Sequence, residues 1–320
     1  WRRDLGPAAA LEVARASTSK GPVTLRVRDD VRLDGVKATF AAAGVAASPA
    51  PRFVGAPRAL MLDGRPPGGV WNLPGWQNAR FEVQDAGSQA IVEACGRGAT
   101  ALDLCAGNGG KALALAARFD AVACHDVDVE RLARLRSRAL RAGVGERVEC
   151  TDGTTTGLAG RRFDLVLVDA PCSGSGVVRR LGRTIALVDE DGLENASAVD
   201  GVGSDPDDAS PPAIDELAAR RRRRDRVADR RADDALAALA ALQGSLLADS
   251  ATRCADRLVF ATCSTLSDEN ESVVAAFADE AFAPWPFEDT CLSGVDGHTR
   301  RLLPNEHHDG FFIARWRRKG

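Results

Sequence analysis

The hydrophobic positions of the chain follow two different spacings, and these spacings predict where strands and helices lie. In residues 1–80, alternating apolar and β-branched residues predict a strand at residues 23–27, and a helical spacing predicts a helix at residues 31–43. Prolines and glycines at residues 66–69 then interrupt both patterns. We therefore expect a small α/β module over residues 1–80 that leads into a linker.

Strands and helices alternate through the rest of the pattern. The expected strands lie at residues 100–104, 121–124, 148–150, 163–168, 258–262 and 310–316. The expected helices lie at residues 111–119, 130–142, 235–247 and 269–282. Strands that alternate with helices of about ten residues predict βαβ units, whose strands form a parallel sheet. Residues 81–320 are therefore predicted to form one α/β domain.

One stretch inside this domain breaks the pattern. Residues 181–233 are rich in acidic residues, serine, proline and glycine, and they include the arginine run at residues 220–224. Such a composition buries too little apolar surface to offset the entropy that is lost when a chain is ordered. We expect a disordered or extended insertion here, which becomes helical toward Arg231.

The composition is that of a globular chain, and it excludes several classes of protein. Of the 320 residues, 42 are basic and 45 are acidic, so the net charge of −3 does not indicate a globally basic nucleic-acid binder. No continuous apolar run reaches the ~18 residues that a membrane helix needs. The 8 cysteines contain no CxxC pair and no secretory signal is found, which favours reduced thiols inside a cell. The chain begins with Trp1 rather than methionine, so we expect a fragment or a processed form.

A glycine-rich loop follows the strand at residues 100–104, and it is the first candidate for chemistry. Glycines let a ligand approach the backbone closely, and the start of the next helix offers unpaired N–H groups. Asp126 ends the following strand about twenty residues later, where dinucleotide-binding folds hold ribose hydroxyls. The GxGxxG spacing of nicotinamide-binding proteins and the GxxxxGK[ST] spacing of P-loops are both absent. We interpret the loop as a nucleotide-type site; the alternative is a plain tight turn.

Two cysteines come directly after predicted strands. Cys172 follows the strand that leads to Asp169, and Cys263 follows the strand at residues 258–262. The carboxyl ends of parallel strands meet along one edge of a sheet, which is where α/β sheets bind ligands. A thiolate is a strong nucleophile, so two cysteines beside a nucleotide-type loop predict an active site. Either cysteine alone would more simply be a small buried residue.

Several segments together resemble the motifs of RNA cytosine-carbon-5 methyltransferases, and most of all the bacterial small-subunit ribosomal-RNA branch of that family. The matching segments are RFEVQD at residues 80–85 with SQ at residues 88–89, the loop at residues 105–111, DAPCSG at residues 169–174, ATCS at residues 261–264 with ENE at residues 269–271, and DGFF at residues 309–312. They occur in the family's order and span most of the chain apart from the insertion. After Arg180 the family continues with a Pro-Asp pair and a Trp, whereas the insertion begins here.

The resemblance implies a fold and a cofactor. The implied fold is α/β, with a Rossmann-like S-adenosylmethionine-dependent methyltransferase domain behind a small N-terminal α/β module that faces RNA. The residues that the resemblance assigns to S-adenosylmethionine are Cys105, Ala106, Gly107, Asn108, Gly109, Gly110, Lys111, Asp126, Asp152 and Asp169.

The resemblance also implies a catalytic pair and a reaction. Cys263 would be the nucleophile that adds to carbon 6 of cytosine, Cys172 would assist release of the product, and Asp169 would hydrogen-bond the edge of the base. Carbon 5 of cytosine is a poor nucleophile until a thiolate has added at carbon 6. The target base must leave its stack to reach such a cleft. The implied reaction is methyl transfer to carbon 5 of a cytosine in RNA, and by the resemblance in ribosomal RNA.

The expected partner is therefore RNA, with no membrane and no metal, because His307 and His308 have no other ligand near them in sequence. We expect a monomer in the cytoplasm, or in an organelle or the nucleus if the source is eukaryotic. Two other functions stay open. A non-catalytic RNA-binding factor for ribosome assembly could keep this fold, although both cysteines are intact. In a DNA cytosine methyltransferase, Cys172 rather than Cys263 would be the nucleophile, which the TCS motif at residues 262–264 disfavours.

Overall fold

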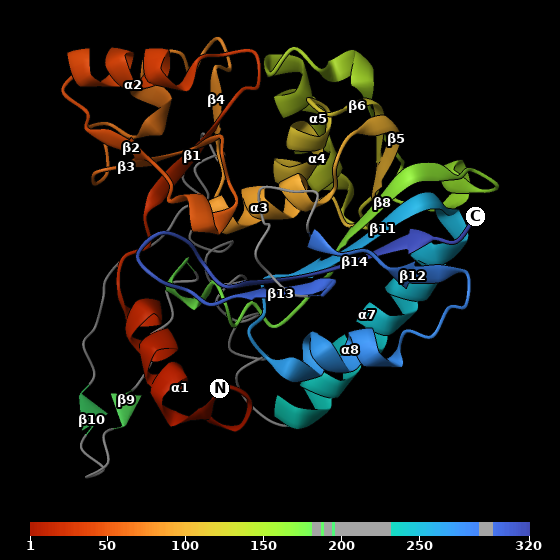
Figure 1. Ribbon diagram of the computed structural model, residues 1–320. Helices are drawn as coiled ribbons and strands as arrows, with labels where there is room; N and C mark the ends of the chain where they lie inside the picture. The colour runs from red at the N-terminus through yellow and green to blue at the C-terminus, as the bar shows by residue number, and fades with distance from the viewer. Residues whose placement is uncertain (181–186, 189–193, 196–231, 288–296) are drawn as a thin grey trace.

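A sheet of eight strands forms the centre of the protein (Figure 1). The computed structural model describes residues 1–180, 187–188, 194–195, 232–287 and 297–320. Within them the strands of this sheet are β5 (Gly98–Asp103), β6 (Phe119–Cys124), β7 (Val148–Cys150), β8 (Phe163–Asp169), β11 (Cys254–Thr262), β12 (Phe282–Pro284), β13 (Thr299–Leu302) and β14 (Phe311–Arg318). They are ordered β12-β14-β11-β8-β5-β6-β7, and β13 also pairs with β14.

The direction of the strands confirms the parallel sheet that the sequence pattern predicts. From β7 to β11 all neighbours run parallel, and β12, β13 and β14 add antiparallel pairs at one side. Strands β6 and β7 follow one another on one side of β5, and β8 and β11 follow one another on its other side. The order of the strands therefore reverses at β5. The crevice beyond the carboxyl ends of the strands at such a reversal is where open α/β sheets bind ligands.

Helices cover both faces of this sheet (Figure 1). The first face carries α3 (Ala86–Ala94), α4 (Gly110–Leu115) and α5 (Val129–Arg141), and the second carries α7 (Ala232–Arg253) and α8 (Glu271–Ala276). Successive side chains of β8 point to opposite faces, so Leu165 and Leu167 join the first core, and Val166 and Val168 join the second. Burial of each such side chain stabilises the fold by about 1.5–3 kcal/mol. This two-sided burial explains why β8 is a continuous apolar run.

Helix α7 is longer than its apolar pattern indicates. Among the described residues it is the one helix that is long and apolar enough to cross a membrane, over Asp234–Arg253. The sequence pattern predicted a helix over residues 235–247 only, so it did not indicate this length. In the fold, however, Leu247 and Ala251 pack into the second core and Gln243 is fully buried. The helix is thus an outer layer of the domain that contacts strands β8 and β11 of the sheet.

The N-terminal residues form a second, smaller sheet. Its elements are α1 (Arg2–Thr18), β1 (Val23–Val27), α2 (Leu33–Ala42), β2 (Ala47–Pro49), β3 (Ala59–Leu62) and β4 (Phe81–Val83), and its antiparallel strands are ordered β2-β3-β1-β4. Strand β1 and helix α2 confirm the predicted elements, whereas α1, β2, β3 and β4, and α3 in the following domain, were not predicted. Residues 66–69, where prolines and glycines interrupt the pattern, lie in the connection between β3 and β4, and the pairing of β4 with β1 continues this sheet to Val83.

The helix expected at residues 269–282 is also wrong in its second half. The chain forms a single-turn helix, then α8, and then β12, because Asn270 leaves helical geometry (φ −120°, ψ −93°) and Phe282 pairs with β14. The insertion expected at residues 181–233 lies outside the described residues, except for the short antiparallel pair β9 (Leu187–Val188) and β10 (Glu194–Asn195) and the start of α7. The single-turn helices are η1 (Arg52–Val54), η2 (Val70–Asn72), η3 (Gly145–Arg147), η4 (Thr156–Leu158), η5 (Val178–Arg180) and η6 (Ser267–Glu269).

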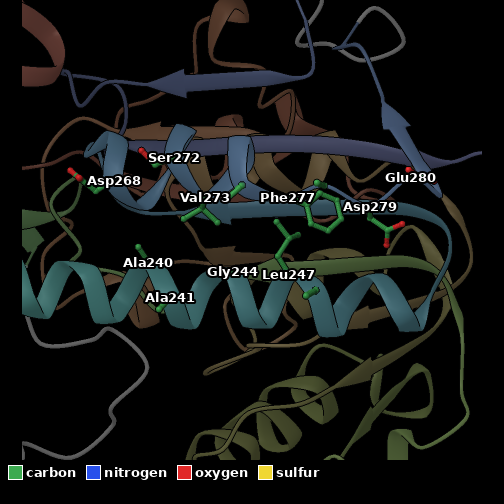
Figure 2. A pocket seen from close by; sticks show the side chains of 13 residues that line it. Ala240, Ala241, Gly244, Leu247, Asp268, Ser272, Val273, Phe277, Asp279 and Glu280 are labelled. Carbon is green, nitrogen blue, oxygen red and sulfur yellow. The ribbon is translucent and has the colours of Figure 1, made fainter.

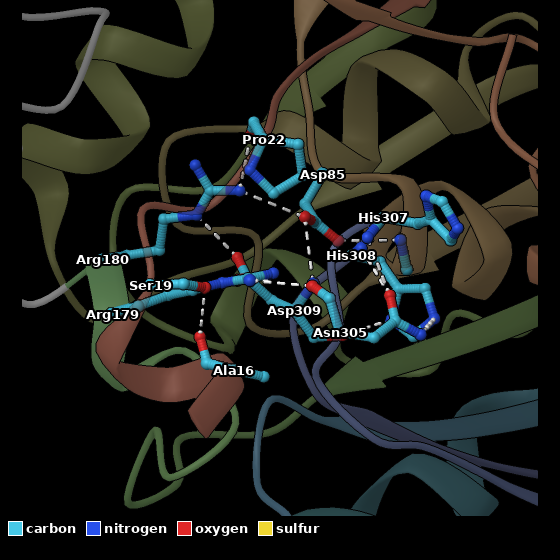
Figure 3. Close-up of polar contacts among 11 residues, drawn as sticks. Ala16, Ser19, Pro22, Asp85, Arg179, Arg180, Asn305, His307, His308 and Asp309 are labelled. Carbon is cyan, nitrogen blue, oxygen red and sulfur yellow. Dashed lines mark hydrogen bonds and ion pairs between the residues drawn. The ribbon is translucent and has the colours of Figure 1, made fainter. Parts of the chain in front are cut away.

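A buried ionic cluster joins the two sheets to the loop after β8 (Figure 3). Asp309, directly before β14, accepts hydrogen bonds from Arg179 Nε at 2.5 Å and from Arg180 Nε at 2.8 Å. Arg180 also donates to Pro22 O and to Asp85, which caps the start of α3. Burial, and then the charge of Asp309, raise the pKa of Asp85 to about 6. The two arginines therefore tie the end of the Cys172 loop to three distant segments, at Pro22, Asp85 and Asp309.

Replacing Asp309 with Asn should lower the free energy of unfolding by about 3 kcal/mol, because it leaves Arg179, whose side chain is 1% exposed, without its counter-charge. Urea unfolding followed by circular dichroism measures the loss. The matched control is Asp30→Asn, which removes an exposed ion pair with Arg28 and should cost at most about 1 kcal/mol. Equal losses in the two variants would contradict a structural role for the cluster.

Candidate functional site

The two cysteines meet at the carboxyl ends of neighbouring strands. Strands β8 and β11 pair in parallel, with Ala261 opposite Asp169, and Ala170 N donates to Ala261 O at 2.8 Å. The two chains therefore leave the sheet side by side. Cys172 and Cys263, each half-buried, lie there with their Sγ atoms 3.3 Å apart. The pairing of the strands thus brings together the two cysteines that the sequence singles out.

The surroundings of Cys172 hold its thiol in the protonated form. The hydrogen bond with Cys263 raises the pKa of Cys172 well above its usual range, and burial raises it further. Cys172 therefore keeps its proton, and its S–H group can donate a hydrogen bond to Cys263 Sγ. Since the thiolate is the nucleophilic form of cysteine, this environment disfavours Cys172 as the attacking group.

The glycine-rich loop has the backbone geometry that close approach of a ligand requires. Gly107 has φ +53° and Gly109 has φ +87°, both in the left-handed region that glycine adopts most easily. A Cβ atom at Gly109 would also lie 2.5 Å from Leu135. Gly107 N donates to Asp126 Oδ2 at 2.8 Å, and Asp128 N donates to Oδ1 of the same carboxylate. Asp126 therefore fastens the loop to the end of β6.

Charged side chains of both signs lie close together here, among them the carboxylates of Asp103, Asp126 and Asp169 and the ammonium group of Lys111. Lys111 Nζ lies 2.6 Å from Asp169 Oδ2; burial alone would lower the pKa of Lys111, but the charge of Asp169 and this hydrogen bond raise it. Burial, and then the charge of Asp169, raise the pKa of Asp103 to about 7, although Lys111 lowers it. Asp103 was not singled out from the sequence; the signal that could have found it is a carboxylate at the end of an apolar strand.

A cavity of about 310 Å³ lies between the glycine-rich loop and these acids. Eight of the ten residues predicted to bind the cofactor line it, namely Cys105, Ala106, Gly107, Asn108, Gly110, Lys111, Asp126 and Asp169. The other two do not line the cavity. Gly109 packs against Leu135. Asp152 is exposed after β7, and its carboxylate accepts hydrogen bonds from Thr154 N and Oγ1. Ser88, Arg131 and Pro171 also line the cavity and were not predicted.

A larger cavity, of about 640 Å³, lies elsewhere, between α7 and α8 (Figure 2). Its described lining is mostly small and apolar, with Asp268, Asp279 and Glu280 as its acidic residues. None of the described residues that line it is a cysteine or carries a positive charge. The chemistry that the sequence predicts is therefore concentrated in the smaller cavity, next to the cysteine pair.

Comparison with known proteins decides the family. A family model described as "16S rRNA methyltransferase RsmB/F" matches residues 91–192 and 217–317, which together are more than half of the chain. The chain belongs to the RsmB/F family. The resemblance found in the motifs is thus confirmed at the level of the family.

Curated relatives agree with this assignment. Ribosomal RNA small subunit methyltransferase B of Sodalis glossinidius is 31% identical over 322 aligned residues, which covers 97% of the RsmB/F chain described here and 62% of that protein. The protein of the same name from Salmonella newport is 31% identical over 317 aligned residues, with 95% and 61% covered. The chain thus spans about three-fifths of the length of these relatives.

Solved structures confirm the fold of this RsmB/F chain. A methyltransferase homolog protein from Pyrococcus horikoshii matches with a TM-score of 0.70 at 21% identity, covering 99% of this chain and 93% of that one. NSun6 from the same organism matches with a TM-score of 0.68 at 14% identity, covering 99% and 96%. The expected Rossmann-like α/β methyltransferase fold is therefore confirmed.

The raised pKa of Asp103 makes the stability of the protein depend on pH. Between about pH 4, where the carboxyl ionises in the unfolded chain, and pH 7, the folded state holds one proton more. The contribution of Asp103 to the free energy of unfolding is therefore fully present below pH 4 and is lost as the pH rises through 7. Asp103→Asn should reduce the loss of stability between pH 5 and pH 8 by about 1–3 kcal/mol.

Chemical denaturation at several pH values measures this effect. The exposed control, Asp120→Asn, should follow the unmodified protein. Parallel stability curves for Asp103→Asn and the unmodified protein would show that Asp103 does not carry the pH dependence.

Proposed function

We propose that this protein transfers a methyl group from S-adenosylmethionine to carbon 5 of a cytosine in ribosomal RNA. The observation that carries the proposal is the pair of Cys172 and Cys263, whose sulfur atoms lie 3.3 Å apart beside the cavity of the glycine-rich loop. Membership of the RsmB/F family and the names of the curated relatives support ribosomal RNA as the substrate.

The residues present fit S-adenosylmethionine as the cofactor. When it is bound, this cofactor supplies a methyl group on a positively charged sulfonium. Three carboxylates, Asp103, Asp126 and Asp169, lie near one ammonium group and the guanidinium of Arg131, so acids outnumber bases in this region, which suits a cation better than a phosphate. Burial raises the pKa of the Cys105 thiol, so this lining residue stays neutral. The loop at residues 105–111 and Asp126 would hold the cofactor, and Asp152 would act from the rim.

Cys263 would act first on the base. Its thiolate forms a bond with carbon 6 of cytosine, and the electron pair of the C5=C6 double bond makes carbon 5 nucleophilic toward the methyl group. Lys111 already occupies Oδ2 of Asp169, which leaves Oδ1 to accept a hydrogen bond from the edge of the base. This contact would hold the cytosine in place while the thiolate adds.

Cys172 would act at release. After methyl transfer the carbon-5 proton passes to water, the S–C6 bond breaks, and its electron pair returns to Cys263. The S–H group of Cys172 donates a hydrogen bond to the departing sulfur and stabilises it as a thiolate. A non-catalytic assembly factor would have no need to keep both thiols in this arrangement, so we favour the enzyme.

The surroundings of the site suggest where RNA binds and where the protein works. The N-terminal module lies beside the catalytic domain (Figure 1) and exposes Trp71 to 47%, an aromatic surface on which a base can stack. One chain supplies the cavity and both cysteines, so a monomer suffices for the reaction. The named relatives are bacterial, which favours the cytoplasm over an organelle or a nucleus.

The two cysteines should give opposite results when each is replaced with Ala. Cys263→Ala should abolish methylation and any covalent complex with RNA, because no sulfur adds to carbon 6. Cys172→Ala should accumulate a covalent complex that survives denaturation, because addition and methyl transfer proceed while release slows. A denaturing gel of each variant with target RNA and methyl donor measures the complex. A trapped band with Cys263→Ala and none with Cys172→Ala would reverse the assignment, as in a DNA-type mechanism.

A further inference from the structure

The residue Glu269 is completely buried in η6 and its carboxylate is held by hydrogen bonds on one side of the cysteine pair. Its two oxygens accept hydrogen bonds from Ser173 N at 2.8 Å, from Ser173 Oγ at 2.6 Å and from Gln243 Nε2 at 3.1 Å. Ser173 directly follows Cys172. A buried carboxylate with several donors is fixed in one geometry, because moving it would leave the charge or the donors unsatisfied.

The residue before Cys172 is held by the same group of side chains. Gln243, fully buried in α7, donates from Nε2 to Pro171 O at 2.9 Å as well as to Glu269. Pro171 and Ser173 are thus both tied to the Gln243–Glu269 pair. Hydrogen bonds from α7 and η6 therefore hold the backbone on both sides of Cys172.

The neighbouring residue Asn270 does the same for the other cysteine. Thr262 Oγ1 donates to Asn270 Oδ1 at 2.6 Å, and Asn270 Nδ2 donates to Ser264 O at 3.0 Å. Thr262 and Ser264 flank Cys263, and both are fully buried. The break in helical geometry at Asn270 separates η6 from α8, so that two consecutive side chains serve two different loops.

We propose that Glu269 and Asn270 are positioning residues that act on one cysteine each, Glu269 on Cys172 and Asn270 on Cys263. The inference rests on the proposed function, since it assigns release to the first cysteine and attack to the second. One turn of chain fixes both loops, so it sets the separation of the two sulfur atoms. Loss of either clamp should therefore impair one half of the reaction more than the other.

The experiment compares Glu269→Ala and Asn270→Ala in the complete chain, with target RNA and methyl donor on a denaturing gel. Glu269→Ala should accumulate the covalent complex, as Cys172→Ala does, with release slowed on the order of 10- to 100-fold for a misplaced group. Asn270→Ala should instead slow formation of the complex by a similar factor. Glu269→Gln keeps an acceptor for Ser173 and should restore release.

The matched control is Glu271→Ala, which lies on the same turn and removes an ion pair with Arg301 instead of a contact to either cysteine loop; it should behave as the unmodified chain. Gln243→Met tests the Cys172 clamp from α7 and should also accumulate complex, so the test does not depend on the folding of one variant. Equal loss of activity in Glu269→Ala and Asn270→Ala, without accumulated complex, would overturn the inference. If Cys172→Ala itself accumulates no complex, the proposed function fails; if it does and Glu269→Ala does not, only the positioning role fails.

Discussion

The parallel pairing of β8 with β11 is the interaction on which the site depends. These strands are separated by more than eighty residues of sequence, yet their register places Ala261 opposite Asp169, and the two cysteine loops leave the sheet together. Both strands bury side chains on each face of the sheet: Leu165 and Val259 in one core, Val166 and Phe260 in the other, all 0% exposed. A shift of register by one residue would turn every one of these side chains to the opposite face. The core therefore enforces the distance between the sulfur atoms.

The electrostatics of the site follow from the same edge of the sheet. Asp103, Asp126 and Asp169 end or directly follow three neighbouring parallel strands, so their charges converge, and burial raises the pKa of Asp103 to about 7. Lys111 offsets one of them from the first turn of α4. The acids that repel one another at this edge of the sheet are the groups that a bound cation would stabilise. The same carboxylates would therefore lower the stability of the folded chain through their mutual repulsion and raise its affinity for a bound cation.

The sequence predicted the parts of this picture that local pattern controls. Apolar runs located the parallel strands, and the residues that end them located the glycine-rich loop and both cysteines. It matched Glu269 to a family motif but predicted no role for it, and it did not single out Gln243, because a glutamine in an apolar helix and a glutamate at a helix start are ordinary at the level of local pattern. Their importance arises only when α7 and η6 pack against the loop after β8. Likewise, β4 lies after a Pro/Gly turn, and only its pairing with β1 assigns it to the N-terminal sheet.

The most direct test of the central claim locates the methyl group on the RNA. Ribosomal RNA that lacks the modification is incubated with the protein and S-adenosylmethionine, treated with bisulfite and sequenced. The account predicts one or a few cytosines that become resistant to conversion with the unmodified chain and stay convertible with Cys263→Ala. Incorporation of labelled methyl into RNA without any resistant cytosine would contradict transfer to carbon 5. Resistance that persists with Cys263→Ala would contradict the role of the cysteine pair.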